Sequence, residues 1–153
     1  ISNALDFGVA LAAASQNNTL VDNVARGSDG AGIAILGGGS ANNIVRRNTV
    51  QGGGIGIAVA ADTNVVTENT VYGTRREGIQ LDGATGVRLS RNRISNTSQY
   101  GVMAVNSATN NYAFQNEIDS AGGAGIYFSA TGTNTSGDMD VPSGSHRASA
   151  SRV

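Results

Sequence analysis

The residues with the most useful chemistry lie between positions 72 and 127 and combine arginine, tyrosine and carboxylate side chains. A guanidinium can hold a carboxylate through two parallel hydrogen bonds. A tyrosine ring can stack on the face of a sugar, and its hydroxyl can act as an acid or a base. We therefore expect a surface for an acidic polysaccharide, formed by Tyr72, Arg75, Arg76, Glu77, Gln80, Asp82, Tyr100 and Tyr127.

We assign two kinds of role within this set. If the chain is catalytic, Arg75 or Arg76 would neutralise a uronate carboxylate, and Tyr72 or Tyr100 would be the acid or base. The expected substrate-binding residues are Glu77, Gln80, Asp82 and Tyr127. The alternative interpretation is a solvated turn in which Arg76 and Glu77 form a local ion pair.

The composition excludes several other kinds of chemistry. The 153 residues include ten charged basic residues, all arginine, no cysteine and one histidine, His146. Disulfides, cysteine metal sites and lysine-dependent mechanisms are therefore excluded, and one histidine is too few for a histidine-based zinc site. We expect no metal and no cofactor. The net charge of −1 indicates no nucleic-acid partner.

We expect neither a signal peptide at the start of the chain nor a membrane-spanning segment. No apolar run reaches the roughly 18 residues of a membrane-spanning helix, so no membrane partner is expected. Ile1 lies almost directly on the first repeat, with no methionine or basic segment before it. We therefore expect the rest of a longer parent chain as a further partner.

Two series of residues recur at nearly constant spacing and specify the elements that must position the candidate side chains. Glycine followed by an aliphatic residue recurs in steps of 24, 24, 22, 23 and 24 residues, at Gly8, Gly32, Gly56, Gly78, Gly101 and Gly125. Asparagine recurs in steps of 20, 25, 21, 23 and 24 residues, at Asn3, Asn23, Asn48, Asn69, Asn92 and Asn116. A fixed period of this length indicates a stacked repeat architecture.

Each repeat is too short for anything but small strands and turns. Three strands of two to five residues with their turns fill about 23 residues and leave no room for a helix. The spacing of a leucine-rich repeat is missing, and a propeller blade needs about 40 residues. We predict an all-β fold, a single-stranded right-handed parallel β-helix (solenoid) of about six coils over residues 1–130. Residues 131–153, which include His146, are expected to be a flexible tail or linker.

The alternation predicts which side chains point into the coil. After the asparagine these are Leu5, Val50, Val71, Ile94 and Ile118; after the glycine, Ile33, Ile57, Ile79, Val102 and Ile126; and on the remaining strand, Leu20, Val45, Val66 and Leu89. β-Branched residues suit such a pleated, buried face. The repeated asparagines are expected to form an internal ladder in which each amide bonds to the next coil.

Charge alternates in the residue before each ladder asparagine. The column runs Asp22, Arg47, Glu68, Arg91 and Gln115. Stacked neighbours would lie about 4.8 Å apart, where opposite charges attract and like charges repel. We interpret this column as a surface salt-bridge ladder that fixes the register of the coils, in preference to a catalytic site.

The outward position of the glycine strand changes character along the chain. It is occupied in turn by Ala10, Ala34, Ala58, Gln80, Met103 and Tyr127. Large or polar side chains therefore appear only in the C-terminal half. Six coils at about 4.8 Å each would give a surface on the order of 29 Å, long enough for an extended polymer.

The Asn-x-Val and Gly-Ile-x-Val phrases over residues 1–130 resemble the parallel β-helix repeat family of NosD-like, carbohydrate-binding and sugar-hydrolase proteins. Residues 68–79, Glu-Asn-Thr-Val-Tyr-Gly-Thr-Arg-Arg-Glu-Gly-Ile, look like a stretch of the mannuronan C5-epimerases. That resemblance implies a module of an exported protein, secreted, periplasmic or at the cell surface, that epimerises or cleaves a uronan such as alginate. It transfers Arg75 as a uronate-binding residue.

The chain departs from that family at its catalytic motif. Where the epimerases carry Asp-Pro-His, this chain has Ala58-Val59-Ala60-Ala61 after Gly56-Ile57. The missing motif and the column of alanines favour an alternative: a non-catalytic solenoid, such as a surface, adhesin or phage-fibre segment, or a carbohydrate-binding module. The charged residues around Arg75 favour sugar binding.

Overall fold

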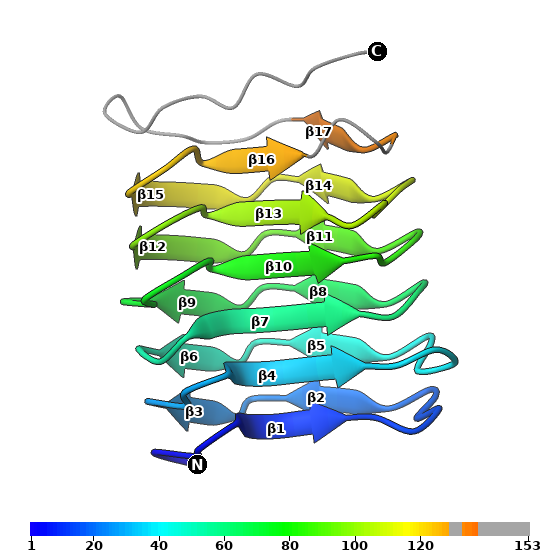
Figure 1. Ribbon diagram of the computed structural model, residues 1–153, viewed down its shortest axis with the longest axis horizontal. Helices are drawn as coiled ribbons and strands as arrows, with labels where there is room; N and C mark the ends of the chain where they lie inside the picture. Colours follow the sequence, from blue (N-terminus) through cyan, green and yellow to red (C-terminus); the bar gives the residue numbers. More distant parts are fainter. Residues whose placement is uncertain (129–132, 138–153) are drawn as a thin grey trace.

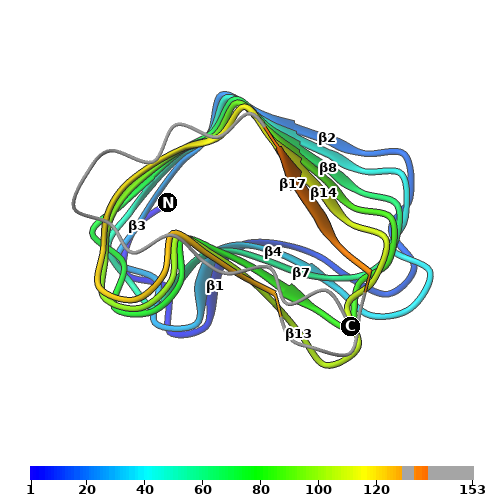
Figure 2. The same ribbon diagram turned by 90° about the horizontal axis from the view of Figure 1, so that it is seen from above.

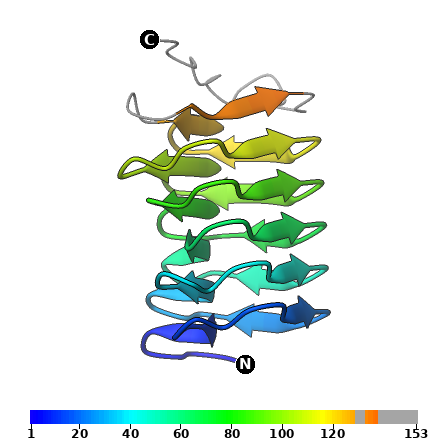
Figure 3. The same cartoon turned by 90° about the vertical axis from the view of Figure 1, so that its right-hand side faces the viewer.

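The computed structural model describes residues 1–128 and 133–137, and they form a right-handed parallel β-helix (Figures 1 and 3). Each coil contributes one strand to each of three parallel sheets, so that neighbouring coils stack along the axis. Five coils are complete, and two strands of a sixth are described. The predicted all-β solenoid of about six coils is thus confirmed.

The three sheets are named here by the order in which the chain enters them. The first sheet consists of β1 (Phe7–Leu11), β4 (Ala31–Leu36), β7 (Ile55–Ala60), β10 (Ile79–Asp82), β13 (Val102–Val105) and β16 (Ile126–Phe128). The second consists of β2 (Thr19–Val21), β5 (Ile44–Arg46), β8 (Val65–Thr67), β11 (Arg88–Ser90), β14 (Tyr112–Phe114) and β17 (Thr135–Gly137). The third consists of β3 (Val24–Arg26), β6 (Thr49–Gln51), β9 (Thr70–Tyr72), β12 (Arg93–Thr97) and β15 (Glu117–Ala121).

The repeated glycine is required where the chain passes from the third sheet into the first. A Cβ on Gly56 would overlap Cγ1 of Val71 and the carbonyl oxygen of Gly78. Gly78 stands in the same relation to Ile94. The glycine therefore makes room for the inward β-branched residue of the third sheet, which explains why the two sequence series keep a common phase.

The core includes the predicted inward residues except Leu5, together with a second inward position of the first sheet, occupied by Ile35, Val59, Leu81 and Ala104. Ile33, Ile57, Ile79 and Val102 of the first sheet are fully buried, as are the inward residues of the other two sheets, Val45, Val66, Leu89, Val50, Val71, Ile94 and Ile118. Ile126 is also buried, whereas Leu20, in the first coil, is only partly buried.

The prediction for the first repeat was wrong in register. Leu5 is 89% exposed, and Asn3 does not belong to the asparagine ladder. Ser2 pairs with Arg26, so that Asn3 lies beside Gly27, at the corner after the third sheet. Asn3 has a φ of 54° and Gly27 one of 63°. Asparagine tolerates this left-handed conformation, which is the physical reason for its presence there.

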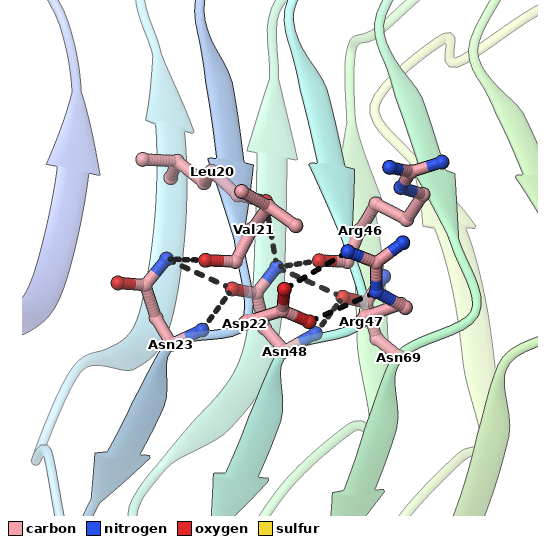
Figure 4. A network of polar contacts seen from close by, with 8 residues as sticks. All are labelled: Leu20, Val21, Asp22, Asn23, Arg46, Arg47, Asn48 and Asn69. Atoms are coloured by element: carbon pink, nitrogen blue, oxygen red, sulfur yellow. Dashed lines mark hydrogen bonds and ion pairs between the residues drawn. The ribbon is translucent and has the colours of Figure 1, made fainter.

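The remaining asparagines form the predicted ladder at the corner between the second and third sheets (Figure 4). Oδ1 of Asn69 accepts from both the backbone N–H (2.9 Å) and Nδ2 (3.0 Å) of Asn48. Nδ2 of Asn48 also donates to the carbonyl oxygens of Leu20 and Arg46. The same pattern runs through Asn23, Asn48, Asn69, Asn92 and Asn116. The ladder satisfies backbone groups that would otherwise be buried without partners.

A second asparagine ladder, which the sequence analysis missed, lies at the corner between the first and second sheets. The backbone N–H of Asn43 donates to Oδ1 of Asn64 at 2.9 Å, and that of Asn18 donates to Oδ1 of Asn43 at 3.0 Å. The pattern resumes at Asn111 and Asn134. Val87 occupies the intervening position, so the ladder is interrupted in the fourth coil.

Within the described residues, the charged column before the first ladder forms one ion pair, between Asp22 and Arg47 (Figure 4). Glu68 is within ion-pair distance of neither Arg47 nor Arg91, so the predicted salt-bridge ladder is limited to this one pair. Arg47 donates to both carboxylate oxygens of Asp22 at 2.9 Å. This hydrogen bond from Arg47 lowers the pKa of Asp22 and, reciprocally, raises the pKa of Arg47, to which Glu68 adds a Coulombic attraction. Arg91 donates to the amide oxygen of Gln115 at 3.3 Å.

The described part of the C-terminal segment continues the stack. β17 pairs in parallel with β14, with Thr135 opposite Tyr112. Most of the expected tail, including His146, lies outside the described residues.

Candidate functional site

The outer face of the first sheet carries most of the candidate residues. The strand register aligns Ala10, Ala34, Ala58, Gln80, Met103 and Tyr127 in one column. Seen along the axis, the turns at both ends of these strands project beyond the sheet (Figure 2). An extended polymer lying across the strands would therefore meet this column and the flanking turns.

The N-terminal half of this face is closed by apolar packing. A small cluster separate from the main core is formed there by Phe7, Ala31, Ala34, Leu36, Ile55 and Ala58. Ala31 and Ala34 are almost completely buried even though their side chains lie on the outer face of the first sheet. This part of the face has no groups for acid–base chemistry, so the candidate site is restricted to the turn of Arg75 and Arg76 and to the fourth and later coils.

Glu77 is the most unusual residue of the site because it is fully buried on the outer side of the sheet. It directly precedes Gly78, as Ile55 precedes Gly56, and the backbone N–H of Gly56 donates to its carbonyl oxygen at 3.0 Å. Neither carboxylate oxygen has a hydrogen-bond partner among the described residues. Nε of Arg76 is 3.5 Å from Oε2, an ion-pair contact too long for a strong hydrogen bond.

Tyr100 and Tyr127 lie together on the same face. Their ring centroids are 4.9 Å apart and their planes differ by 21°, so the rings are stacked. Tyr127 is 41% exposed. A Cβ on Gly123 would come within 3.0 Å of the Tyr100 ring, which shows that this ring is enclosed on that side. The pair therefore presents Tyr127 as the accessible aromatic surface.

Arg75 is held in an ion pair that spans three coils. Its Nη2 is 2.8 Å from Oδ1 of Asp29, and both side chains are well exposed. The turn between them, Gly52-Gly53-Gly54, has no side chains, and the backbone N–H of Arg75 donates to the carbonyl oxygen of Gly53. An exposed pair of this kind contributes about 0–1 kcal/mol, so a ligand carboxylate can replace Asp29 at small cost.

Two of the predicted residues lie apart from this group. Tyr72 ends β9 and belongs to the third sheet, where it pairs with Gln51 and Ser95. Asp82 lies at the end of β10 remote from Glu77, and it accepts a hydrogen bond from Nδ2 of Asn106 at 2.7 Å. The structure therefore brings Glu77, Gln80, Tyr100 and Tyr127 onto one face, with Arg75 and Arg76 in its adjoining turn.

The sequence analysis missed Asp29 as the partner of Arg75. The signal was present in the three consecutive glycines of the intervening turn, because a turn without side chains lets its neighbours above and below approach each other. The residues that the structure describes contain no cluster of three or more histidine, cysteine or acidic side chains that could hold a metal. Those same residues include no helix long and apolar enough to cross a membrane.

Comparison with known proteins agrees with the geometry. A family profile described as "Right handed beta helix region" matches residues 1–138. The chain belongs to this right-handed β-helix family. No curated protein sequence matches the chain.

One solved structure extends the comparison. The fold is similar to that of the crystal structure of the periplasmic alginate epimerase AlgG, with a TM-score of 0.83 and 16% sequence identity. The likeness covers 90% of this chain but only 36% of the AlgG chain. At this identity the comparison establishes a common fold, as the sequence resemblance predicted, and the chain spans about a third of the length of that structure.

Proposed function

We propose that this chain is the β-helix module of an exported polysaccharide-active protein, and that the first sheet binds an acidic polysaccharide across its fourth to sixth coils, beside the turn of Arg75 and Arg76. The observation that carries the proposal is the change along the outer column from alanine to Gln80, Met103 and Tyr127, next to the turn of Arg75 and Arg76. The shared fold with a periplasmic alginate epimerase supports both the polymer class and an exported location.

Each group at this surface has a role that its chemistry allows. The exposed ring of Tyr127 would stack on a sugar. Arg75 would exchange Asp29 for a uronate carboxylate, because bidentate guanidinium–carboxylate pairs are geometrically specific. In an epimerase-like or lyase-like reaction, the same neutralisation would ease removal of the C5 proton, with a tyrosine such as Tyr100 as acid or base.

The second candidate is a non-catalytic solenoid or carbohydrate-binding module. It is favoured by Ala58-Val59-Ala60-Ala61, where epimerases carry Asp-Pro-His, and by the apolar cluster that closes this part of the face. The carbohydrate-binding module shares polymer binding at the first sheet with the enzyme and differs from it in turnover, whereas a purely structural solenoid would bind no polymer there.

The test is to incubate the chain with polymannuronate and polygalacturonate and to follow C5–H exchange and unsaturated products by NMR, alongside retention on a uronan affinity gel. Retention with exchange or unsaturated product supports the enzyme, and retention alone supports the binding module. Tyr127→Ala and Arg75→Gln should each reduce retention. The absence of retention, exchange and product with every uronan would reject the proposal.

A further inference from the structure

The arginines divide into two groups according to whether the guanidinium has a partner. Six of the eight described arginines contact an acceptor side chain, in the pairs Arg26–Gln51, Arg47–Asp22, Arg75–Asp29, Arg76–Glu77, Arg91–Gln115 and Arg93–Glu117. Within the described ranges, Arg46 and Arg88 make no side-chain hydrogen bond or ion pair, and Nε of Arg46 is buried without an acceptor. Both belong to the second sheet.

The outer face of the second sheet has no acidic residue at its described strand positions. One outward column contains Thr19, Ile44, Val65, Arg88, Tyr112 and Thr135, and the other contains Val21, Arg46, Thr67, Ser90, Phe114 and Gly137. Arg46 adds a Coulombic contribution at Asp22, but the Asp22 carboxylate is already held by Arg47 (Figure 4). The two free guanidinium groups therefore give this face a net positive charge.

The same face also exposes aromatic rings. Tyr112 is 54% exposed and Phe114 37% exposed, and both belong to β14. Since they are two residues apart on one side of a strand, their Cα atoms lie about 6.6 Å apart. Tyr112 is directly opposite Arg88 on the adjacent strand, at about 4.8 Å. The second sheet therefore presents exposed aromatic rings for stacking and the unpaired guanidinium of Arg88 side by side on one face.

We propose that the outer face of the second sheet is a separate binding surface for a linear acidic polysaccharide. Tyr112 and Phe114 stack on the C–H faces of successive sugars, while Arg88 and Arg46 hold carboxylates. Arg46 lies two strands and two residues from Arg88, about 12 Å away, so the two cations address different sugars of one chain. The hydroxyls of Thr67 and Ser90, bonded to each other at 2.8 Å, lie between them.

This surface is independent of the first sheet, which lies across the interior of the coil from it (Figure 2). A polysaccharide fits better than a nucleic acid, the other polymer that uses aromatic stacking and cations. A nucleic acid presents a phosphate at every nucleotide and is bound through many basic residues. Here two unpaired arginines stand on a chain whose net charge is −1.

The surface is tested by measuring the affinity of the chain for polymannuronate and polygalacturonate by titration calorimetry, with oligo(dT) as the competing probe. The double variant R46Q/R88Q and the single variant Y112A should each weaken uronan binding at least about tenfold. The control R93Q removes an exposed charge from the third sheet and should change affinity less than twofold. Tyr127→Ala, on the first sheet, should not alter the part of the uronan affinity that the second sheet contributes.

Three results would overturn the inference. The first is that R46Q/R88Q and Y112A bind uronans like the unmodified chain, whatever Tyr127→Ala does. The second is that R93Q lowers affinity as much as R46Q/R88Q, which would mean diffuse electrostatic attraction. The third is that oligo(dT) binds as tightly as the uronans and with the same dependence on Arg46 and Arg88, which would assign the face to nucleic acid. Loss of binding in Tyr127→Ala alone would leave only the first-sheet proposal standing.

Discussion

At the scale of single residues, Glu77 differs most from its counterparts in the other coils. The corresponding positions hold Phe7, Ala31 and Ile55, which are packed in an apolar cluster. Glu77 is as deeply buried as Ala31 and Ile55, yet both of its carboxylate oxygens lack hydrogen-bond partners in the described part of the chain. A buried polar group without partners costs about 1–3 kcal/mol. Stability alone does not explain this carboxylate, which is why it belongs in the candidate site.

We predict that Glu77→Ile stabilises the protein by about 1–2 kcal/mol, because an apolar side chain above Ile55 removes the cost of the buried carboxylate. Urea unfolding measures the change. The matched control is Glu117→Ile, since Glu117 is half exposed and paired with Arg93, and its replacement should stay within about 0.5 kcal/mol. A clear loss of stability in Glu77→Ile would mean that the carboxylate has a structural role.

The Asp22–Arg47 pair predicts a dependence of stability on pH. Because the hydrogen bond from Arg47 lowers the pKa of Asp22 in the folded protein, the pair stabilises the fold above the ordinary aspartate pKa, and this stabilisation is lost as pH falls through the lowered value. Asp22→Asn keeps a residue that tolerates the φ of 57°. The urea midpoint of the wild type should exceed that of the variant at pH 7, and the two should converge in acid.

High salt provides the control for this measurement, since the pair is exposed and therefore screened. The difference between the wild type and Asp22→Asn at pH 7 should shrink in 1 M salt. A difference that persists unchanged in acid and in salt would contradict an electrostatic origin.

At the scale of elements, the sequence was most informative where every coil obeys the same steric rule. From Gly32 to Gly101, the repeated glycine at the start of each first-sheet strand is required by the inward side chain of the third sheet, so its period could be read directly as the period of the coils. The first repeat was misplaced because Asn3 is itself the left-handed residue at its corner, with a φ of 54°, whereas each ladder asparagine follows a left-handed residue, as Asn48 follows Arg47. Composition cannot separate a corner residue from a ladder residue without the pairing partner.

We predict that Gly56→Ala destabilises the protein by about 2–3 kcal/mol, because the added methyl group overlaps Val71 and the backbone of the next coil. Gly38→Ala is the control: a Cβ there meets no atom within 4 Å, and its φ is not positive. Thermal unfolding compares the two variants. Equal stability of Gly56→Ala and Gly38→Ala would disprove the steric account of the glycine column.

The second asparagine ladder was not recognised from the sequence because Val87 interrupts it, so asparagine does not recur there in every coil. Because the ladder is interrupted at Val87, an asparagine at this position should stabilise the protein. Val87→Asn would place an amide oxygen where the backbone N–H of Asn64 can donate to it, as that of Asn43 does to Asn64. We expect a gain of about 1 kcal/mol by urea unfolding. Val87→Ala, which removes volume and supplies no acceptor, should be destabilised, and a loss in both variants would show that packing dominates here.

At the scale of the whole molecule, the repeat made the architecture predictable, whereas the pairing of surface side chains was not. The parallel register brings Arg88 beside Tyr112 and aligns Tyr127 with Gln80, as a uniform coil length requires. The ion pair of Arg75 with Asp29 depends on the turn Gly52-Gly53-Gly54, which lies between them and has no side chains. No periodic pattern in the sequence predicts this pair. The free arginines of the second sheet, Arg46 and Arg88, stand out because each of the other described arginines contacts an acceptor side chain.

A stack of coils in which each contacts only its neighbours is stabilised unevenly along its axis. In the first coil the inward residues Val9, Leu11 and Leu20 are only partly buried, whereas Ile57, Val59 and Val66 of the third coil are buried completely. The amides of β1 and β2 bond to one neighbouring strand, and those of β7 and β8 lie between two. The middle of the stack should therefore open at a higher free energy than the first coil.

Hydrogen exchange followed by mass spectrometry tests this gradient. Peptides covering β7 and β8 should exchange at least about tenfold more slowly than peptides covering β1 and β2. Val66→Ala, in the third coil, should accelerate exchange throughout the stack, because it weakens the interfaces on both sides. Leu20→Ala should accelerate exchange mainly in β1 to β3. Uniform exchange in all coils, or equal effects of the two substitutions, would mean that the solenoid unfolds as a single cooperative unit.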